Sequence, residues 1–286
     1  MTPELTQDEA AARSLGLALL AASSNYEGFL IPRTEGLLRR RPFPPHRRAV
    51  IGLVGRQRRF LRAAYTLADA GMALEAIGPL RSMFEFLVCE RWLALDPDRN
   101  WKLWMHENHR ARDVWRERFR HHAPSLHDEA VASLTPEQRE EADVIARVRA
   151  QVAAELGDRQ PDDRQGIEQR AAQVGLGFVY DGIYRYESNA ATHPTLLAVD
   201  LLLERVPRGL VLRGAPTAQF APLPVYLHGA ELLYEALKTS SELSPPLRLT
   251  ELRSLGDTLR ELVERHASSR LPNWQKLLPS EAFDQP

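Results

Sequence analysis

The sequence has little cysteine and no long apolar run near its N-terminus. Cys89 is the single cysteine among 286 residues, so an internal disulfide framework is excluded. The apolar run from Leu15 to Ala22 is too short to cross a bilayer, and the residues before it are acidic. We therefore expect no signal peptide, no membrane partner and a cytoplasmic location.

Lysine is also scarce, because the only lysines are Lys102, Lys238 and Lys276. The net charge of −1 gives no global attraction for nucleic acid or anionic membranes. Locally, the stretch from Arg33 to Arg62 holds ten arginines and one acidic residue. Such a cluster could bind phosphates, or it could be a solvated helix face that pairs with acids elsewhere.

Several sequence motifs of known chemistry are absent. The chain has no GxxxxGK[ST] phosphate loop, no GxGxxG turn and no GxSxG nucleophile elbow. His106 and His109 are three residues apart and do not match the HExxH zinc motif. We therefore predict no metal site and no cofactor.

The stretch from Gly71 to Leu95 is too long for a strand and apolar on nearly every side, which predicts a buried central helix. Apolar spacing predicts further helices around it, so the fold class is all-α, a multi-helix bundle with a short β-hairpin near 208–222. The expected helices are 4–24, 47–69, 96–122, 135–156, 178–193, 194–205, 223–240 and 249–266.

The organisation along the chain predicts one helical domain over residues 1–270. A highly charged helix and the polar loop after it suggest a peripheral insertion at about 125–166. Residues 271–286 are expected to form a C-terminal tail.

Polar residues at predicted apolar positions are the first candidates for a site. Arg81 falls on the apolar face of the central helix, and Glu85 lies one turn later, within reach of an ion pair. Asn108 and Arg112 interrupt an aromatic stripe on the next helix. Either all four form one interior polar network, or the second pair is simply exposed.

The second candidate stretch is the tyrosine-rich segment 178–195. Its polar side chains exceed what a core helix needs, which suggests the lining of a ligand pocket or a wet interface between helices or subunits. We expect Tyr184, Tyr186, Ser188 and Asn189 to bind a ligand, together with Arg81, Glu85, Asn108 and Arg112. We also expect His193, next to Glu187, to act as a general base.

Arg81, Ser82 and Glu85 on one helix, followed about a hundred residues later by Ser188 and the pair His193 and Pro194, form a pattern that resembles the bacterial family catalogued as domain of unknown function 5677. The resemblance covers roughly residues 45–265. It implies an all-helical fold related to helical nucleotide-binding domains of defence and toxin systems. Many of those domains act on RNA through an Arg that stands four to six residues before a His. Here seven residues separate Arg185 from His193, which departs from that pattern.

Three functions fit these residues. The leading hypothesis is a helical ligand-binding protein that binds, and in one version cleaves, RNA or a nucleotide in a defence or stress role. The second is a non-catalytic interaction module or homodimer with a structural polar network, and the third is a small-molecule enzyme that uses the same pocket. Neither a substrate nor a reaction follows from the sequence.

Overall fold

The computed structural model describes residues 5–24, 45–156, 166–185, 188–189, 203–206, 209–212, 221–243 and 251–266. Within these residues the chain is helical apart from one antiparallel hairpin, so the all-α prediction is confirmed. None of the described helices is both long and apolar enough to span a membrane.

Most of the helices fall close to the predicted ranges. In chain order they are α1 (Gln7–Ala22), α4 (Pro45–Asp69), α5 (Ile77–Leu95), α6 (Pro97–His122), α7 (Pro124–Ala132), α8 (Pro136–Leu156), α9 (Ile167–Gln173), α10 (Gly177–Val179), the π-helical turn η2 (Tyr180–Tyr184), α13 (Leu223–Leu243) and α14 (Leu252–Arg265). The hairpin consists of β1 (Leu203–Val206) and β2 (Gly209–Leu212).

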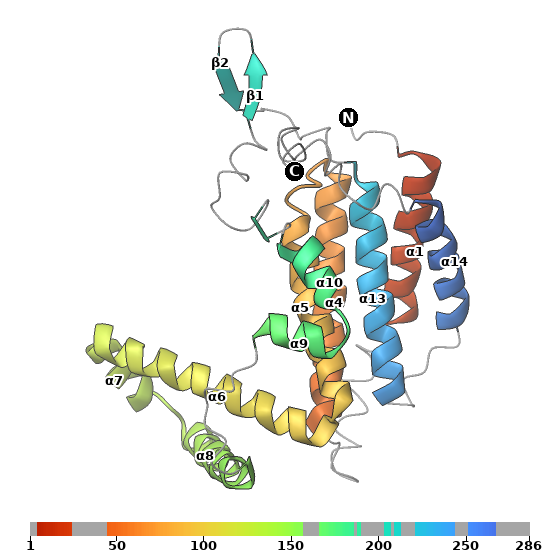
Figure 1. Cartoon of the computed structure of the whole chain (residues 1–286). Coiled ribbons are helices and arrows are strands. Elements are labelled where there is room, and N and C mark those ends of the chain that lie inside the picture. Colours follow the sequence, from red (N-terminus) through yellow and green to blue (C-terminus); the bar gives the residue numbers. More distant parts are fainter. Residues whose placement is uncertain are drawn as a thin grey trace, which may run out of the picture. The chain divides into compact units, whose positions relative to one another are not determined.

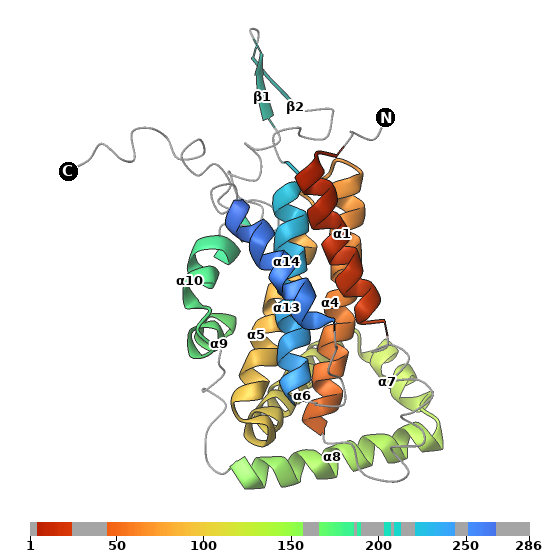
Figure 2. The same cartoon turned by 90° about the vertical axis from the view of Figure 1, so that its right-hand side faces the viewer.

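The chain divides into two compact units. The first unit combines residues 1–94 with residues 167–286, and the second consists of residues 95–166. In the first unit α1, α4, α5, α13 and α14 run side by side, with α9 and α10 beside α5 (Figures 1 and 2). The predicted insertion at 125–166 lies wholly within the second unit, which begins thirty residues earlier.

The core of the first unit is built from apolar stripes on these helices. Leu19 on α1, Leu61 on α4, Leu80 on α5 and Leu233 on α13 are representative, since each side chain is almost completely buried in one continuous cluster. α5 contributes on nearly every side, as its composition predicts. It is therefore the central helix of the sequence prediction.

Local signals explain where three helices begin. Thr6 and Glu9 form a capping box at the start of α1. Asp96 caps α6 by accepting a hydrogen bond from the Arg99 N–H at 3.2 Å. At α8 the Thr135 hydroxyl accepts from the Gln138 N–H at 3.3 Å, while the Gln138 side chain accepts from the Thr135 N–H at 2.9 Å. The caps at Asp96 and Thr135 confirm the predicted starts of α6 and α8.

The structure corrects three details of the prediction. The central helix begins at Ile77, because residues 71–76 form turns and Gly71 has a φ of +78°, which favours glycine. The hairpin spans 203–212, so the helix expected over 194–205 is wrong at its end. The described residues of the helix expected at 178–193 are helical, but they include the π-helical turn η2 and π-helical residues 188–189, and the rest of that range lies outside the described residues. Two short helices, α7 and α9, were not predicted.

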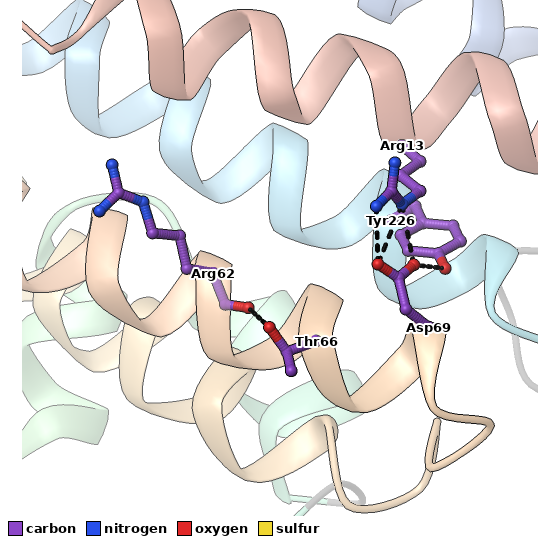
Figure 3. Close-up of polar contacts among 5 residues, drawn as sticks. All are labelled: Arg13, Arg62, Thr66, Asp69 and Tyr226. Atoms are coloured by element: carbon purple, nitrogen blue, oxygen red, sulfur yellow. Dashed lines mark hydrogen bonds and ion pairs between the residues drawn. The ribbon is translucent and has the colours of Figure 1, made fainter.

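A polar cluster joins three helices of the first unit (Figure 3). The Arg13 guanidinium on α1 donates three hydrogen bonds to Asp69 on α4, from Nε to Oδ1 at 2.8 Å and to Oδ2 at 3.1 Å, and from Nη2 to Oδ2 at 2.7 Å. The Tyr226 hydroxyl on α13 donates to Asp69 Oδ1 at 2.6 Å, and the Tyr65 hydroxyl donates to the Tyr226 carbonyl at 2.7 Å. The hydrogen bonds from Arg13, ahead of that from Tyr226, lower the pKa of Asp69. The cluster therefore fixes how α1 and α13 align on α4.

In the second unit α6 and α8 are in contact and cross one another (Figures 1 and 2). Lys102 Nζ lies 2.5 Å from Glu155 Oε2, and the Arg149 guanidinium makes two contacts with the Asp113 carboxylate, one of them 3.2 Å long. These ion pairs join the two helices at two separate points and so help to fix how the helices align.

Candidate functional site

Three of the predicted ligand-binding residues come together between α5 and η2. Arg81 Nη2 donates to the Tyr184 hydroxyl oxygen at 2.8 Å, and that hydroxyl donates to Glu85 Oε1 at 2.5 Å. Arg81 and Glu85 also form the predicted ion pair, with Nη2 and Oε1 3.2 Å apart. The Arg81 side chain is 26% exposed and that of Glu85 40%, so the pair is half-buried rather than buried as we expected.

Aromatic and guanidinium groups stack around this hydroxyl. The Tyr184 ring lies 5.4 Å from Phe84 and 4.9 Å from Tyr180, measured between ring centroids. The Arg81 guanidinium lies 5.0 Å from the Tyr184 centroid, and that of Arg185 lies 5.2 Å from the Tyr180 centroid. A π-helical turn carries both tyrosines, and such turns are frequent at functional sites. The result is a layered stack of two rings and two cations.

The Tyr184 hydroxyl is a proton donor at neutral pH. Burial, together with the hydrogen bond to Glu85 and the negative charge of Glu85, raises the pKa of Tyr184 to about 12, and Arg81 offsets only part of that shift. The phenol therefore keeps its proton and holds Arg81 and Glu85 in place. It does not serve as a base or a nucleophile at neutral pH.

Removing this hydroxyl tests its contribution. Tyr184→Phe is expected to lower the free energy of unfolding by about 1 kcal/mol, because Arg81 and Glu85 can still pair directly and the ring stays packed. Urea unfolding measures the change, and Tyr180→Phe is the matched control because the Tyr180 hydroxyl makes no hydrogen bond with the described residues. Equal stability of Tyr184→Phe and wild type would show that the hydroxyl bonds have no net effect.

The other predicted residues of this segment are placed only in part. Ser188 is buried and its hydroxyl donates to the Tyr184 carbonyl at 2.7 Å, whereas Asn189 is exposed. Tyr186, Glu187 and His193, which include both predicted catalytic residues, lie outside the described residues.

Asn108 and Arg112 belong to the second unit, not to the unit that holds Arg81 and Glu85. Both side chains are exposed, and Asn108 Nδ2 donates to the Trp104 carbonyl of its own helix at 2.9 Å. Of the two alternatives considered for this pair, the structure shows the exposed one. Within the described residues, no cluster of three or more His, Cys, Asp or Glu side chains could hold a metal ion.

The described part of the arginine cluster divides into a buried and an exposed set on α4. Arg58 is completely buried and donates to the Leu20 carbonyl at 3.1 Å. Arg56, Arg59 and Arg62 are exposed at a spacing of three residues, on one face of the helix. Their guanidinium groups form no ion pair with the described part of the chain. Figure 3 shows Arg62 directed away from the Arg13 cluster, and the only bond drawn to it comes from the Thr66 hydroxyl to its backbone carbonyl, at 2.9 Å.

An aromatic pair lies beside the exposed arginines. Phe60 on α4 stacks on Phe86 on α5, with ring centroids 5.6 Å apart and an angle of 26° between the rings. Both side chains are half-buried, so part of the pair faces solvent. Phe60 follows Arg59 directly, and Phe86 follows Glu85. The pair therefore connects the arginine face of α4 with the helix that carries Arg81 and Glu85.

One buried polar pair was not predicted from the sequence. Glu90 on α5 is completely buried and accepts a hydrogen bond from Gln57 Nε2 of α4 at 2.9 Å. Glu90 lies seven residues after Met83 and so on the same apolar face of the helix. Helical periodicity could therefore have predicted that Glu90 is buried. Burial raises the pKa of Glu90 well above its ordinary value, and the Gln57 hydrogen bond and the Arg91 charge counter only part of that rise.

These features define a helical protein with a stacked arginine–tyrosine site and a separate arginine face. Comparison with known families then identifies the chain: residues 47–208 match the model of a family of unknown function, DUF5677, and the chain belongs to that family. The match includes α4, α5, Tyr184 and the whole second unit, but not α1, α13 or α14. No curated protein and no solved structure matches the chain.

Proposed function

We propose that this protein binds RNA through the exposed face of α4. The observation that supports this most directly is the row formed by Arg56, Arg59 and Arg62, three exposed guanidinium groups without an acidic partner among the described residues. Some exposed arginines elsewhere in the chain do meet an acid three residues away, as Arg120 meets Glu117 and Arg260 meets Asp257. Within the part of the chain that the structure describes, no acid competes with an external anion for the row on α4.

The spacing of the row favours a polymer over a single nucleotide. Successive arginines are three residues apart, so they rise about 4.5 Å along the helix and the whole row extends about 9 Å. Long, flexible arginine side chains at this spacing can reach successive phosphates of one strand. A mononucleotide presents its phosphates in a single cluster and would engage fewer of the three.

The aromatic pair adds a second element of RNA recognition. Phe60 and Phe86 present partly exposed ring surface beside the arginines, and bases of single-stranded nucleic acid stack on such rings. On α5 the face of Phe86 continues through Ser82 and Glu85 to Arg81, all half-buried. We propose this face of α5, with Tyr184, as the place where a base is bound. The proposal concerns binding alone, because the predicted catalytic residues, His193 and Glu187, lie outside the described residues.

A binding titration with short fluorescein-labelled single-stranded RNA tests the proposal. We expect the triple variant Arg56→Gln/Arg59→Gln/Arg62→Gln to bind at least about tenfold more weakly than wild type at low salt. The slope of log K against log salt concentration should fall by about 2, since each phosphate contact on a single strand contributes about 0.7.

A variant with the same charge change on another helix is the control. Arg253→Gln/Arg260→Gln/Arg265→Gln removes three exposed arginines from α14 and should bind the RNA as wild type does. Two results would overturn the proposal: no binding by wild type, or an equal loss in the α4 and α14 variants, which would indicate attraction by net charge alone. Phe86→Leu then reports the stacking contribution at constant charge.

A further inference from the structure

The second unit does not bury a core of its own. Within its described residues Val152 is the one hydrophobic side chain that is fully buried. Most of the large hydrophobic side chains exposed in the described chain belong to this unit, among them Trp115, Val144 and Val148. Trp115 is 66% exposed, and the ring it stacks on among the described residues is Phe119 of its own helix, with ring centroids 5.4 Å apart. Exposed apolar surface of this kind marks an interaction site.

Trp115, Val144 and Val148 lie outside the contact between α6 and α8. That contact forms a groove lined by Arg112, Asp113 and Arg116 of α6 and by Ala142, Ile145 and Arg149 of α8. Trp115 lies on α6 about 100° or more around the helix from Asp113 and Arg116. Val144 and Val148 lie one turn apart on the same side of α8. Both are about 100° or more around the helix from Ala142 and Arg149. Each helix thus has a second apolar face that its neighbour leaves uncovered.

The charges beside the two apolar faces have opposite signs. On α6, Arg112 and Arg118 flank Trp115 at three residues on either side, and both are exposed. On α8, Glu140 lies one turn and Glu137 two turns before Val144, and both are exposed. None of these four side chains forms an ion pair with the described residues. The apolar face of α6 therefore has a basic border. The apolar face of α8 has an acidic border before Val144, and the exposed Arg147 lies beyond it.

We infer that this surface binds a second copy of the same chain. In a two-fold symmetric pair, α6 of one protomer packs against α8 of its partner, and the same contact occurs a second time. Trp115 is then covered by Val144 and Val148 of the second copy, and the four exposed charges pair across the interface. Joined in this way, the α6–α8 pairs of two protomers cover each other's exposed apolar faces, which supplies the core that one pair lacks. An unrelated partner would have to match both charge patterns, whereas a second copy does so by symmetry.

The mass of the full-length protein in solution tests this inference. By light scattering after size exclusion, wild type is expected at twice its chain mass of 32.4 kDa and Trp115→Asp at the chain mass. Arg253→Asp, on an exposed position of α14, is the control and should remain dimeric. Helix content by circular dichroism confirms that the variants are folded.

Charge reversal separates a specific interface from a loss of stability. The variant Arg112→Glu/Arg118→Glu and the variant Glu137→Arg/Glu140→Arg should each be monomeric, since α6 and α8 then carry charges of the same sign. An equimolar mixture of the two should form a heterodimer, because both α6–α8 contacts regain opposite charges. A monomeric wild type, a dimer insensitive to Trp115→Asp, or a mixture that stays monomeric would overturn the inference, and an RNA-dependent dimer would assign the face to RNA instead.

Discussion

Replacing Gly229 by leucine is expected to lower the free energy of unfolding by about 3 kcal/mol, the largest effect of any substitution considered for this chain. A Cβ atom at this position of α13 would lie 2.5 Å from Leu61 Cδ1, 3.2 Å from Tyr65 Cε1 and 3.3 Å from Leu80 Cδ2. All three neighbours are buried in the core and have no free space to move into. α13 would have to separate from α4 and α5 to admit the side chain.

Gly52 provides the matched control. It lies within α4, and no atom lies within 4 Å of a Cβ built at this position. Gly52→Leu should therefore leave stability unchanged or raise it by about 0.5–1 kcal/mol, because glycine is a poor helix former. Urea unfolding of both variants measures the difference. If both substitutions destabilise equally, close packing of α13 on α4 is not the reason for Gly229.

The second large effect concerns Glu90 and depends on pH. The raised pKa of Glu90 means that the folded state keeps a proton that the unfolded chain releases above its ordinary pKa. This group's contribution to stability is complete below that ordinary pKa and is lost as pH rises toward the raised value in the folded state. Within that window each pH unit lowers the free energy of unfolding by up to about 1.4 kcal/mol.

Glu90→Gln is expected to remove this pH dependence. An amide is neutral at every pH, and its N–H groups face Gln57 Oε1, an acceptor with no partner among the described residues. The difference in unfolding free energy between variant and wild type, measured from about pH 5 to about pH 8, should grow in favour of the variant. Glu75→Gln, at an exposed position, should show no such trend. A difference that does not change with pH would contradict a neutral Glu90 in the folded protein.

Much of the fold could be predicted because helical spacing is a local property. The predicted ranges for α4, α6, α8 and α13 agree with the structure to within a few residues, and the caps at Asp96 and Thr135 account for two of the starts. The segment after Gly177 could not be predicted in the same way. Its composition allows a regular helix, whereas the π-helical turn depends on the packing of Tyr180 and Tyr184 against α5.

The site was predictable only where its residues share a helix. The spacing of Arg81 and Glu85 predicts their ion pair, and the aromatic segment 178–195 includes Tyr184. Pairs between helices, such as Gln57 with Glu90 or Arg13 with Asp69, depend on how the helices align, which periodicity does not specify. The sequence also does not specify which face of α4 packs against its neighbours. It therefore could not show that Arg58 is buried while Arg56 and Arg59 are exposed.

The position of α1 has a consequence for synthesis on the ribosome. α1 is made first, yet its principal partners in the bundle are α13 and α14, which are made last. Even the contacts of Arg265 and His266 with Asp8 join the two ends of the described chain. The apolar face of α1, with Leu15 and Leu19, therefore has to wait for almost the whole chain to emerge before it is covered. During translation this face is a natural target for a chaperone that binds nascent chains.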